Sequence, residues 1–210
     1  MAQTYSINVS QVREVLFAGR TVTTGIYKQP VHGEISVAEM GLAGDAQADL
    51  TVHGGLDKAV YFYPREHYSL WKQILTSSDL SPGSFGENIT SEGLTEAELY
   101  VGDVLRIGTA ILQVLQPRSP CYKLQVKFGR ADMVAQFVKL GLPGWYASVL
   151  QPGRFSTNDP IEIVSRAPER ITISEIWNYS LVSSPDAETL ERVMQLKLLP
   201  DFWKERIARS

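Results

Sequence analysis

The chain has 210 residues, of which 44% are hydrophobic and 20% are charged, and its formal net charge is −3. This length and apolar content predict one large domain, with or without a small appendage, and a sizeable core. The slightly acidic balance argues against stable nucleic-acid binding, because such proteins usually carry a strongly basic domain. We find neither a secretory signal nor an apolar window long enough to span a bilayer. We therefore expect a soluble, cytoplasmic protein.

The first 63 residues contain short segments of β character. Segments 13–19, 21–28, 33–41, 48–52 and 58–63 are rich in β-branched or aromatic residues and are separated by glycine-bearing turns. This spacing favours a strongly bent sheet or barrel over alternating strands and helices. The sequence therefore predicts a mainly β (α+β) fold.

Two helices and further strands are expected in the middle of the chain. The first helix should cover 64–75, with Pro64 in its first turn. Its apolar positions should be Tyr68, Leu70, Trp71 and Ile74. A hairpin is expected over 103–117, turning at Gly108 and Thr109, and a second helix over 131–141. Segments 144–150 and 159–166 supply further strands.

The character of the sequence changes near residue 168. A capping box, Thr172 with Glu175, predicts one helix start, and Ser184 followed by a proline predicts a second. A third helix begins after Pro200 and should bury apolar side chains. These side chains are Phe202, Trp203 and Ile207. We place a domain boundary here, with a β domain at 1–167 and a three-helix segment at 168–210. Helices this short need to pack together or onto the main domain.

Cys121 is the only cysteine and lies in the stretch QPRSPCYKL. Pro120 fixes the backbone that enters it, and Arg118 and Lys123 place positive charge nearby. If a helix starts just after this residue, the thiol lies at a helix N-terminus, where the partial positive charge favours thiolate. The alternative is a small buried apolar side chain.

A second candidate site is the segment GDAQADLTVHGGLDKAV at 44–60. The glycine pair allows backbone N–H groups to approach a ligand closely, and an imidazole and an ammonium lie beside it. The residues concerned are His53, Gly54, Gly55 and Lys58. They could form an anion cradle. The alternative is a hairpin turn with a solvated lysine.

The polar turn GSFGENIT at 83–90 is a third candidate. Asn88 offers paired donor and acceptor groups that could read a heterocycle, although a turn of this kind can also bond its own backbone. We interpret His32 and His67 as structural, because neither has a partner at metal-ligand spacing. A Cys121–His53 hydrolase pair remains open, since such partners meet only in the fold.

The ordered set of GDAQADLTVHGGLDKAVYFYPREHYSLW, GSFGENIT and GLTEAELYVGDVLRIGTAILQVLQPRSPCYKL resembles the MOSC domain family. The likeness is greatest to the YiiM-like stand-alone bacterial subgroup, which carries a C-terminal three-alpha segment. The resemblance implies a β-barrel-like core with peripheral helices and a pterin-bound molybdenum cofactor. It also implies that Cys121 is the metal ligand and catalytic residue. Residues expected to contact the cofactor are His53, Gly54, Gly55, Lys58, Asn88, Arg118 and Lys123.

The activity implied by this resemblance is the reduction of N-hydroxylated compounds to amines or amidines, as in detoxification. The expected substrates are hydroxylamino-purines, such as 6-hydroxylaminopurine, and amidoximes, with no need for pyridoxal phosphate. A single cysteine cannot build an iron–sulfur cluster, and no GxGxxG fingerprint follows a strand, so we expect electrons from a separate reductase. The alternatives are a sulfur carrier with a Cys121 persulfide and a cofactor-binding module without catalysis.

Overall fold

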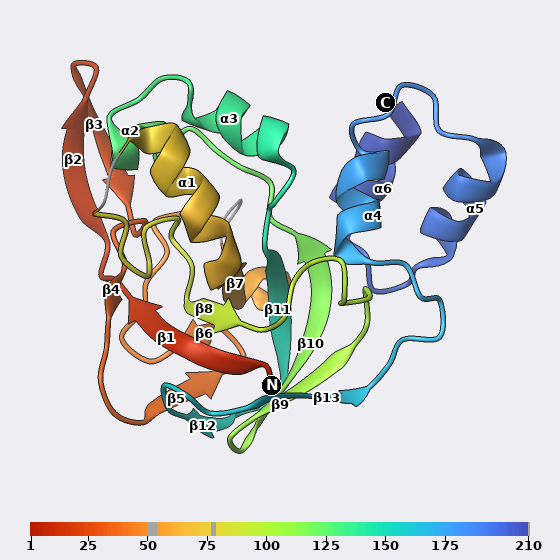
Figure 1. The fold of residues 1–210 in the computed structure, drawn as a ribbon, viewed down its shortest axis with the longest axis horizontal. Helices are drawn as coiled ribbons and strands as arrows, with labels where there is room; N and C mark the ends of the chain where they lie inside the picture. Colours follow the sequence, from red (N-terminus) through yellow and green to blue (C-terminus); the bar gives the residue numbers. More distant parts are fainter. Residues whose placement is uncertain (50–53, 77–78, 210) are drawn as a thin grey trace.

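The computed structural model describes residues 1–49, 54–76 and 79–209 (Figure 1). It is a mixed α+β fold, which confirms the predicted class. The strands are β1 (Gln3–Val9), β2 (Arg13–Phe17), β3 (Arg20–Thr24), β4 (Gln29–Pro30), β5 (Ile35–Ala38), β6 (Gly41–Leu42), β7 (Val60–Pro64), β8 (Ile89–Glu92), β9 (Val104–Ile107), β10 (Ala110–Pro117), β11 (Trp145–Gln151), β12 (Gly153–Phe155) and β13 (Ile161–Ser165). The helices are η1 (Leu56–Lys58), η2 (Arg65–His67), α1 (Tyr68–Leu75), α2 (Lys123–Phe128), α3 (Met133–Leu140), α4 (Ile173–Tyr179), α5 (Ala187–Gln195) and α6 (Asp201–Arg209), the η elements being 3₁₀ helices.

One large sheet forms the centre of the molecule. Its strand order is β13-β9-β10-β11-β7-β8-β1-β4, and every neighbouring pair is antiparallel except β7 and β8. A three-stranded sheet, β12-β5-β6, and the hairpin β2–β3 complete the β structure of the described residues. The predicted hairpin at 103–117 is confirmed as β9–β10, with Ala110 paired to Ile107 across the turn.

The main sheet curves so that its two ends come close together. Backbone hydrogen bonds join the segment before β13 to β1, from Thr4 to Asp159 at 2.9 Å and from Asn158 to Thr4 at 2.6 Å. Nevertheless, the strands assigned in the described part of the chain do not form a closed ring. The barrel-like core stays a prediction.

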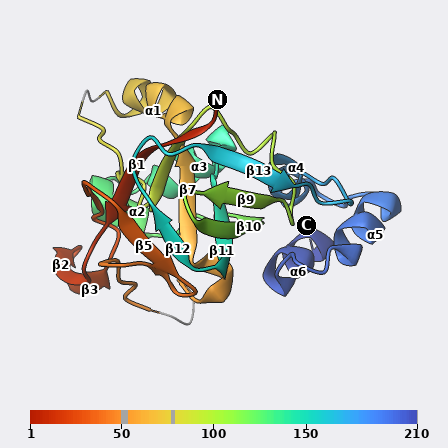
Figure 2. The same ribbon diagram turned by 90° about the horizontal axis from the view of Figure 1, so that it is seen from below.

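A continuous apolar core joins the sheet to the C-terminal helices. Phe62 and Trp145 stack inside the sheet with ring centroids 5.2 Å apart. Trp177 of α4 and Trp203 of α6 are also fully buried in this core, with centroids 6.1 Å apart. Figures 1 and 2 both place α4, α5 and α6 at one end of the molecule and the β2–β3 hairpin at the other.

A second, aromatic cluster packs α1 and α3 against the sheet. Tyr63, Trp71, Phe85 and Phe137 are all fully buried there. The Trp71 indole N–H donates to the Tyr63 hydroxyl at 2.6 Å, so the polar atoms of this cluster are paired as well as buried. This packing fixes β7 and the turn that carries Phe85, and both of these contribute to the candidate site described below.

The first helix begins later than predicted. Pro64 has a ψ of 132° and pairs with Ser91 as the last residue of β7, so the chain is still extended at this position. A single 3₁₀ turn follows, and α1 starts at Tyr68. Leu70 is 42% exposed, although we expected it to be buried, because it points about 100° around the helix away from the buried Trp71.

The C-terminal helices follow the prediction with two corrections. The Thr172–Glu175 capping box is present at the start of α4. The side chain of Asp186, and not Ser184, caps α5 by accepting a hydrogen bond from the Thr189 N–H. In α6, Phe202 is 54% exposed, whereas Trp203 and Ile207 are buried. None of the helices in the described ranges combines the length and apolar character needed to cross a lipid bilayer.

Candidate functional site

A pocket of about 580 Å³, part of it open to solvent, lies where several distant segments meet. The segment after β3, residues 46–48 and the loop before β7 form part of its wall. The turn 85–88, the stretch from Arg118 to Lys123 and Tyr146 of β11 complete it. Of the predicted site residues, the pocket gathers Gly54, Lys58, Asn88, Arg118, Cys121 and Lys123. Gly55 does not line it, and His53 lies outside the described residues.

Cys121 is half-buried in the short connection between β10 and α2. Its backbone carbonyl accepts a hydrogen bond from the Leu124 N–H at 3.0 Å, which closes the turn that leads into the helix. Because α2 begins at Lys123, the thiol-bearing residue lies just before a helix N-terminus, as the sequence predicted. The cysteine is therefore a wall residue of the pocket and not a member of either apolar core.

Arg118 carries a buried positive charge at the same wall. Its side chain is 6% exposed, and its Nη1 atom has no hydrogen-bond partner among the described residues. Burial alone would lower the pKa of the guanidinium, but the nearby Tyr61 and Cys121 outweigh it and raise the pKa. A buried charge with an unsatisfied donor is costly unless an anion pairs with it. The guanidinium is thus prepared to bind an anion.

Three lysines add to this positive charge. Lys58 is half-buried and Lys123 is buried, and both line the pocket. Lys28 is also buried and forms an ion pair with Asp45 in the pocket wall. Burial lowers the pKa of Lys28 and of Lys58, in each case against the opposing effect of a neighbouring aspartate. With Arg118, four cationic side chains converge here although the chain as a whole is acidic, so the pocket attracts anions.

The Asn88 amide is bound within the protein. Its nitrogen donates to Asp45 Oδ2 at 2.8 Å, and its oxygen accepts from the Tyr61 N–H at 3.1 Å. Asp45 in turn accepts from the Ser10 N–H at 2.9 Å and pairs with Lys28. Asn88 therefore holds Asp45, and through it the lysine, in position. Direct contact between the amide and a ligand stays a prediction.

Glu87, next to Asn88, holds the turn together through hydrogen bonds. Its buried carboxylate accepts from the Gly83 N–H at 2.8 Å, the Phe85 N–H at 3.0 Å and the Thr90 hydroxyl at 2.9 Å, as well as from Tyr68. Burial raises its pKa. The polar turn thus does bond its own backbone, which was the simpler interpretation of its sequence.

Glycine is required at two places in the pocket wall. Gly54 has φ +86°, and a Cβ there would come within 3.0 Å of the Gln47 side chain. At Gly25 an added Cβ would lie 2.2 Å from the Ala46 carbonyl oxygen, so any larger residue must displace the backbone. The importance of the Gly-Gly segment was anticipated, but that of Gly25 was not.

Sequence reasoning missed several wall residues, among them Lys28, Tyr61 and Tyr146. Lys28 lies in the connection between β3 and β4, whereas Tyr61 and Tyr146 lie on β7 and β11, and no local motif marks them. His67 is buried and pairs with Glu96 at 2.8 Å, in agreement with its structural interpretation. Within the described ranges, no group of three or more His, Cys, Asp or Glu side chains gathers as a metal site would.

These observations define a class of protein, namely an α+β protein with a cationic, glycine-walled pocket and one thiol at its edge. A family model described as the MOSC domain matches residues 49–162. The chain is also 38% identical over 199 residues to the uncharacterized protein YflK of Bacillus subtilis, a match that covers 95% of this chain and 90% of that protein. The chain belongs to the MOSC domain family.

Further relatives agree with this assignment. Protein YiiM of Escherichia coli is 44% identical over 182 residues, which cover 86% of this chain and 81% of YiiM. The crystal structure of YiiM from Geobacillus stearothermophilus superimposes with a TM-score of 0.83 at 31% identity and covers 99% of this chain and 98% of that chain. The chain is therefore similar to stand-alone YiiM-like proteins along its whole length.

A more distant relative carries a name that indicates chemistry. A protein of Gibberella moniliformis named reductase is 28% identical over 195 residues, which cover 90% of this chain but only 35% of that longer protein. MOSC domains form a molybdenum cofactor-binding family, so membership fits a role related to that cofactor.

Proposed function

We propose that the pocket binds the molybdenum cofactor, with the Cys121 thiolate as the protein ligand of the metal. The observation that carries this proposal is the buried Arg118 guanidinium, whose Nη1 atom has no partner among the described residues in a pocket that also contains the thiol. A thiolate is a soft ligand and suits a metal already held by the sulfurs of a pterin dithiolene.

The remaining wall residues fit the other end of such a cofactor. Its phosphate requires positive charge, which Arg118, Lys58 and Lys123 in the wall of one pocket supply. Gly54 lines the pocket without a side chain, so a ligand can approach its backbone closely. Lys28 and Asn88, which also line the pocket, are held in position through Asp45. His53 and Gly55 remain candidates for cofactor contact that no present observation supports.

The reaction that we propose is the reduction of N-hydroxylated compounds, such as hydroxylamino-purines and amidoximes, to the parent amines or amidines. It consumes two electrons and two protons and releases water. The bound cofactor supplies the redox-active metal, and the protein supplies position and electrostatics. Lys28 holds a proton at Nζ in the pocket wall, and burial lowers its pKa, which makes that proton easier to give up.

Electrons come, in this proposal, from a separate reductase, and the reaction serves detoxification in the cytoplasm. The sulfur-carrier and binding-module alternatives use the same pocket. The three hypotheses differ in what the purified protein contains and turns over.

The test is to purify the protein from a molybdenum-replete host and to measure molybdenum and pterin per chain. We expect near-stoichiometric amounts in the wild type and a large loss in Cys121→Ala. The loaded protein should then reduce 6-hydroxylaminopurine with an artificial electron donor. Cyanide-labile sulfur on Cys121 without molybdenum would instead support the carrier, and loading without turnover would support the module.

A further inference from the structure

Gln116 lies on β10, two residues before Arg118, and its side chain is only 2% exposed. Its amide makes two hydrogen bonds in opposite directions. The nitrogen donates to the Asp57 backbone carbonyl at 3.0 Å, and the oxygen accepts from the Trp203 indole N–H at 3.0 Å. One side chain therefore bridges η1 and α6, which are far apart in the sequence.

The two hydrogen-bond partners allow only one orientation of the Gln116 side-chain amide. An indole N–H is a donor and nothing else, so it must face the amide oxygen. A backbone carbonyl only accepts, so it must face the amide nitrogen. Neither glutamate nor a hydrocarbon side chain can make both bonds, because glutamate cannot donate to Asp57 when ionised and a hydrocarbon can do neither. The two neighbours of residue 116 thus require a side chain that offers both a donor and an acceptor.

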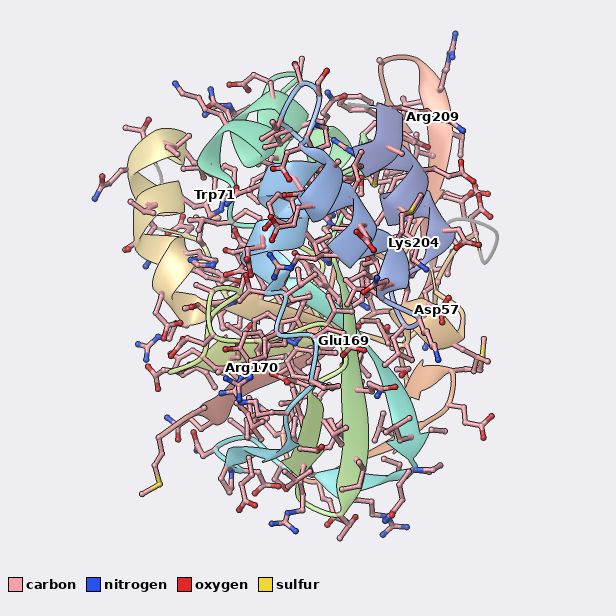
Figure 3. All side chains as sticks on the ribbon, turned by 90° about the vertical axis from the view of Figure 1, so that its right-hand side faces the viewer. Asp57, Trp71, Glu169, Arg170, Lys204 and Arg209 are labelled. Carbon is pink, nitrogen blue, oxygen red and sulfur yellow. The ribbon has the colours of Figure 1, made fainter. Side chains whose placement is uncertain are left out.

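The hydrogen bonds of Gln116 connect α6 to a turn that forms part of the pocket wall. Asp57 belongs to the same 3₁₀ turn as Lys58, whose N–H donates to the Gly55 carbonyl at 3.1 Å. Lys58 and Gly54 both line the pocket. Figure 3 shows Asp57 beneath the part of α6 that carries Lys204, and a second cavity is lined by Asp57 together with residues 197–201. The turn that presents Lys58 thus lies against the C-terminal helices.

We propose that Gln116 is a positioning residue, through which α6 holds the Lys58 turn in the wall of the pocket. The C-terminal helices are then a working part of the pocket, although none of their residues lines it. This inference rests on the proposed function only in the identity of the ligand. The mechanical link between α6 and the turn is independent of it.

The structure offers a matched pair of tryptophans for the test. Trp203→Phe removes the indole N–H that holds Gln116, whereas Trp177→Phe removes an equally buried indole N–H that has no partner in the described part of the chain. Hydrogen exchange of the backbone amides in residues 54–60 should accelerate about three- to tenfold in Trp203→Phe, the effect expected for one lost hydrogen bond. In Trp177→Phe it should remain at the wild-type rate.

A second matched pair lies on β10. Gln116→Met removes both hydrogen bonds while nearly keeping the volume. Gln113→Met makes the same change on the same strand. Gln113 also lines the cavity beside Asp57, but among the described residues its amide bonds only to the Gly102 carbonyl, at 3.4 Å. We expect faster exchange at 54–60 and lower molybdenum and pterin content in Gln116→Met alone. This pair decides the question even if Trp203→Phe does not fold.

Equal exchange at 54–60 in both members of each pair would overturn the proposal. If the wild type contains no molybdenum, the proposed function fails, but the exchange measurements still decide the role of Gln116. Faster exchange at 54–60 with unchanged cofactor content would show that the link exists and does not serve the pocket, which also overturns the proposal.

Discussion

We expect the buried charge of Arg118 to favour ligand binding and to disfavour folding of the cofactor-free protein. Its guanidinium is buried and charged, and one of its nitrogens lacks a partner in the described structure. The rings of Tyr61 and Phe137 lie 5.3 and 5.0 Å from its Cζ atom and offset part of the cost of burial. The remaining free-energy cost of burying the charge is offset only when an anion binds in the pocket. A residue of this kind is typical of a binding site and not of a core.

Replacing Arg118 should therefore change two measurements in opposite directions. Arg118→Met should lower cofactor retention by about tenfold or more, because a charge-assisted hydrogen bond is lost. The free energy of unfolding of the cofactor-free protein at neutral pH should stay the same or rise, since a buried charge with an unsatisfied donor is removed. Burial raises the pKa of Tyr61, so its hydroxyl is uncharged at this pH and does not compensate the guanidinium. Cofactor content after dialysis and urea unfolding provide the two values. Unchanged retention, or a marked loss of apo stability, would contradict this role.

The pKa of Lys58 predicts how cofactor binding depends on pH. Burial lowers its pKa below the usual 10.5, in spite of Asp57. The charged form binds the anion, so retention should fall as the pH rises through this lowered pKa. Arginine stays protonated throughout this range. Lys58→Arg should therefore retain cofactor at pH values where the wild type loses it, when both are dialysed between about pH 7 and pH 10. Parallel loss from both proteins would refute a role for the Lys58 charge.

The sequence predicted part of this site and not the rest. Cys121 and Arg118 lie three residues apart, and Pro120 and the following helix mark them locally. Lys28 and Tyr146 come to the same pocket only through the pairing of strands distant in sequence, which no local pattern specifies. The prediction for Asn88 concerned a ligand, whereas the amide holds Asp45 and the Tyr61 backbone. Its two partners could not be known without the fold.

At the scale of elements, helix starts were predictable where a side chain pairs with a nearby backbone group. The Thr172 hydroxyl accepts from the Glu175 N–H at 3.0 Å, and the Glu175 carboxylate accepts from the Thr172 N–H at 2.7 Å. Ser184 and Asp186 both suit a cap, and the backbone decides between them, because Ser184 has φ +61° and Asp186 has the extended conformation that a cap requires.

The capping box of α4 can be tested by a pair of substitutions. Thr172→Ala should lower the free energy of unfolding by about 1 kcal/mol, because the Glu175 N–H loses its acceptor. Thr172→Ser keeps the hydroxyl and should cost much less. Urea unfolding measures both. Equal losses in the two variants would show that the threonine methyl, and not the cap, stabilises this helix.

The late start of α1 could not be predicted from the local sequence pattern. A proline at a first helical turn is a standard start signal. Here Pro64 ends a strand that runs parallel to β8, and its partner Ser91 is 27 positions away. The pairing of Pro64 with β8 therefore outweighs the helix-start signal of the proline. The exposure of Leu70 has a separate cause, since successive helical residues point about 100° apart and Trp71 takes the buried direction.

For the whole molecule, the central question is whether the two predicted parts fold together. Trp177 and Trp203 of the terminal helices belong to the same buried cluster as Phe62 and Trp145 of the sheet. The division at residue 168 remains a proposal about sequence organisation. The fold class was accessible from the short β segments, whereas the strand order and the near-closure of the sheet depend on long-range pairs that the sequence pattern does not encode.

The shared core predicts one cooperative unfolding transition. Far-ultraviolet circular dichroism and tryptophan fluorescence should give coincident curves in urea, because unfolding of the helices exposes core residues of the sheet. Trp145→Phe and Trp177→Phe, measured separately, show which part of the fluorescence signal reports the sheet and which reports the C-terminal helices. Two separated transitions would mean that the C-terminal helices form an independent unit.

The proposed function depends above all on Cys121 as a ligand of molybdenum. X-ray absorption at the molybdenum edge counts the sulfur atoms around the metal, and Cys121→Ser replaces one soft ligand with a hard one. We predict one fewer sulfur ligand in Cys121→Ser than in the wild type, measured on samples of equal molybdenum content. The same sulfur count in both proteins would contradict the central claim.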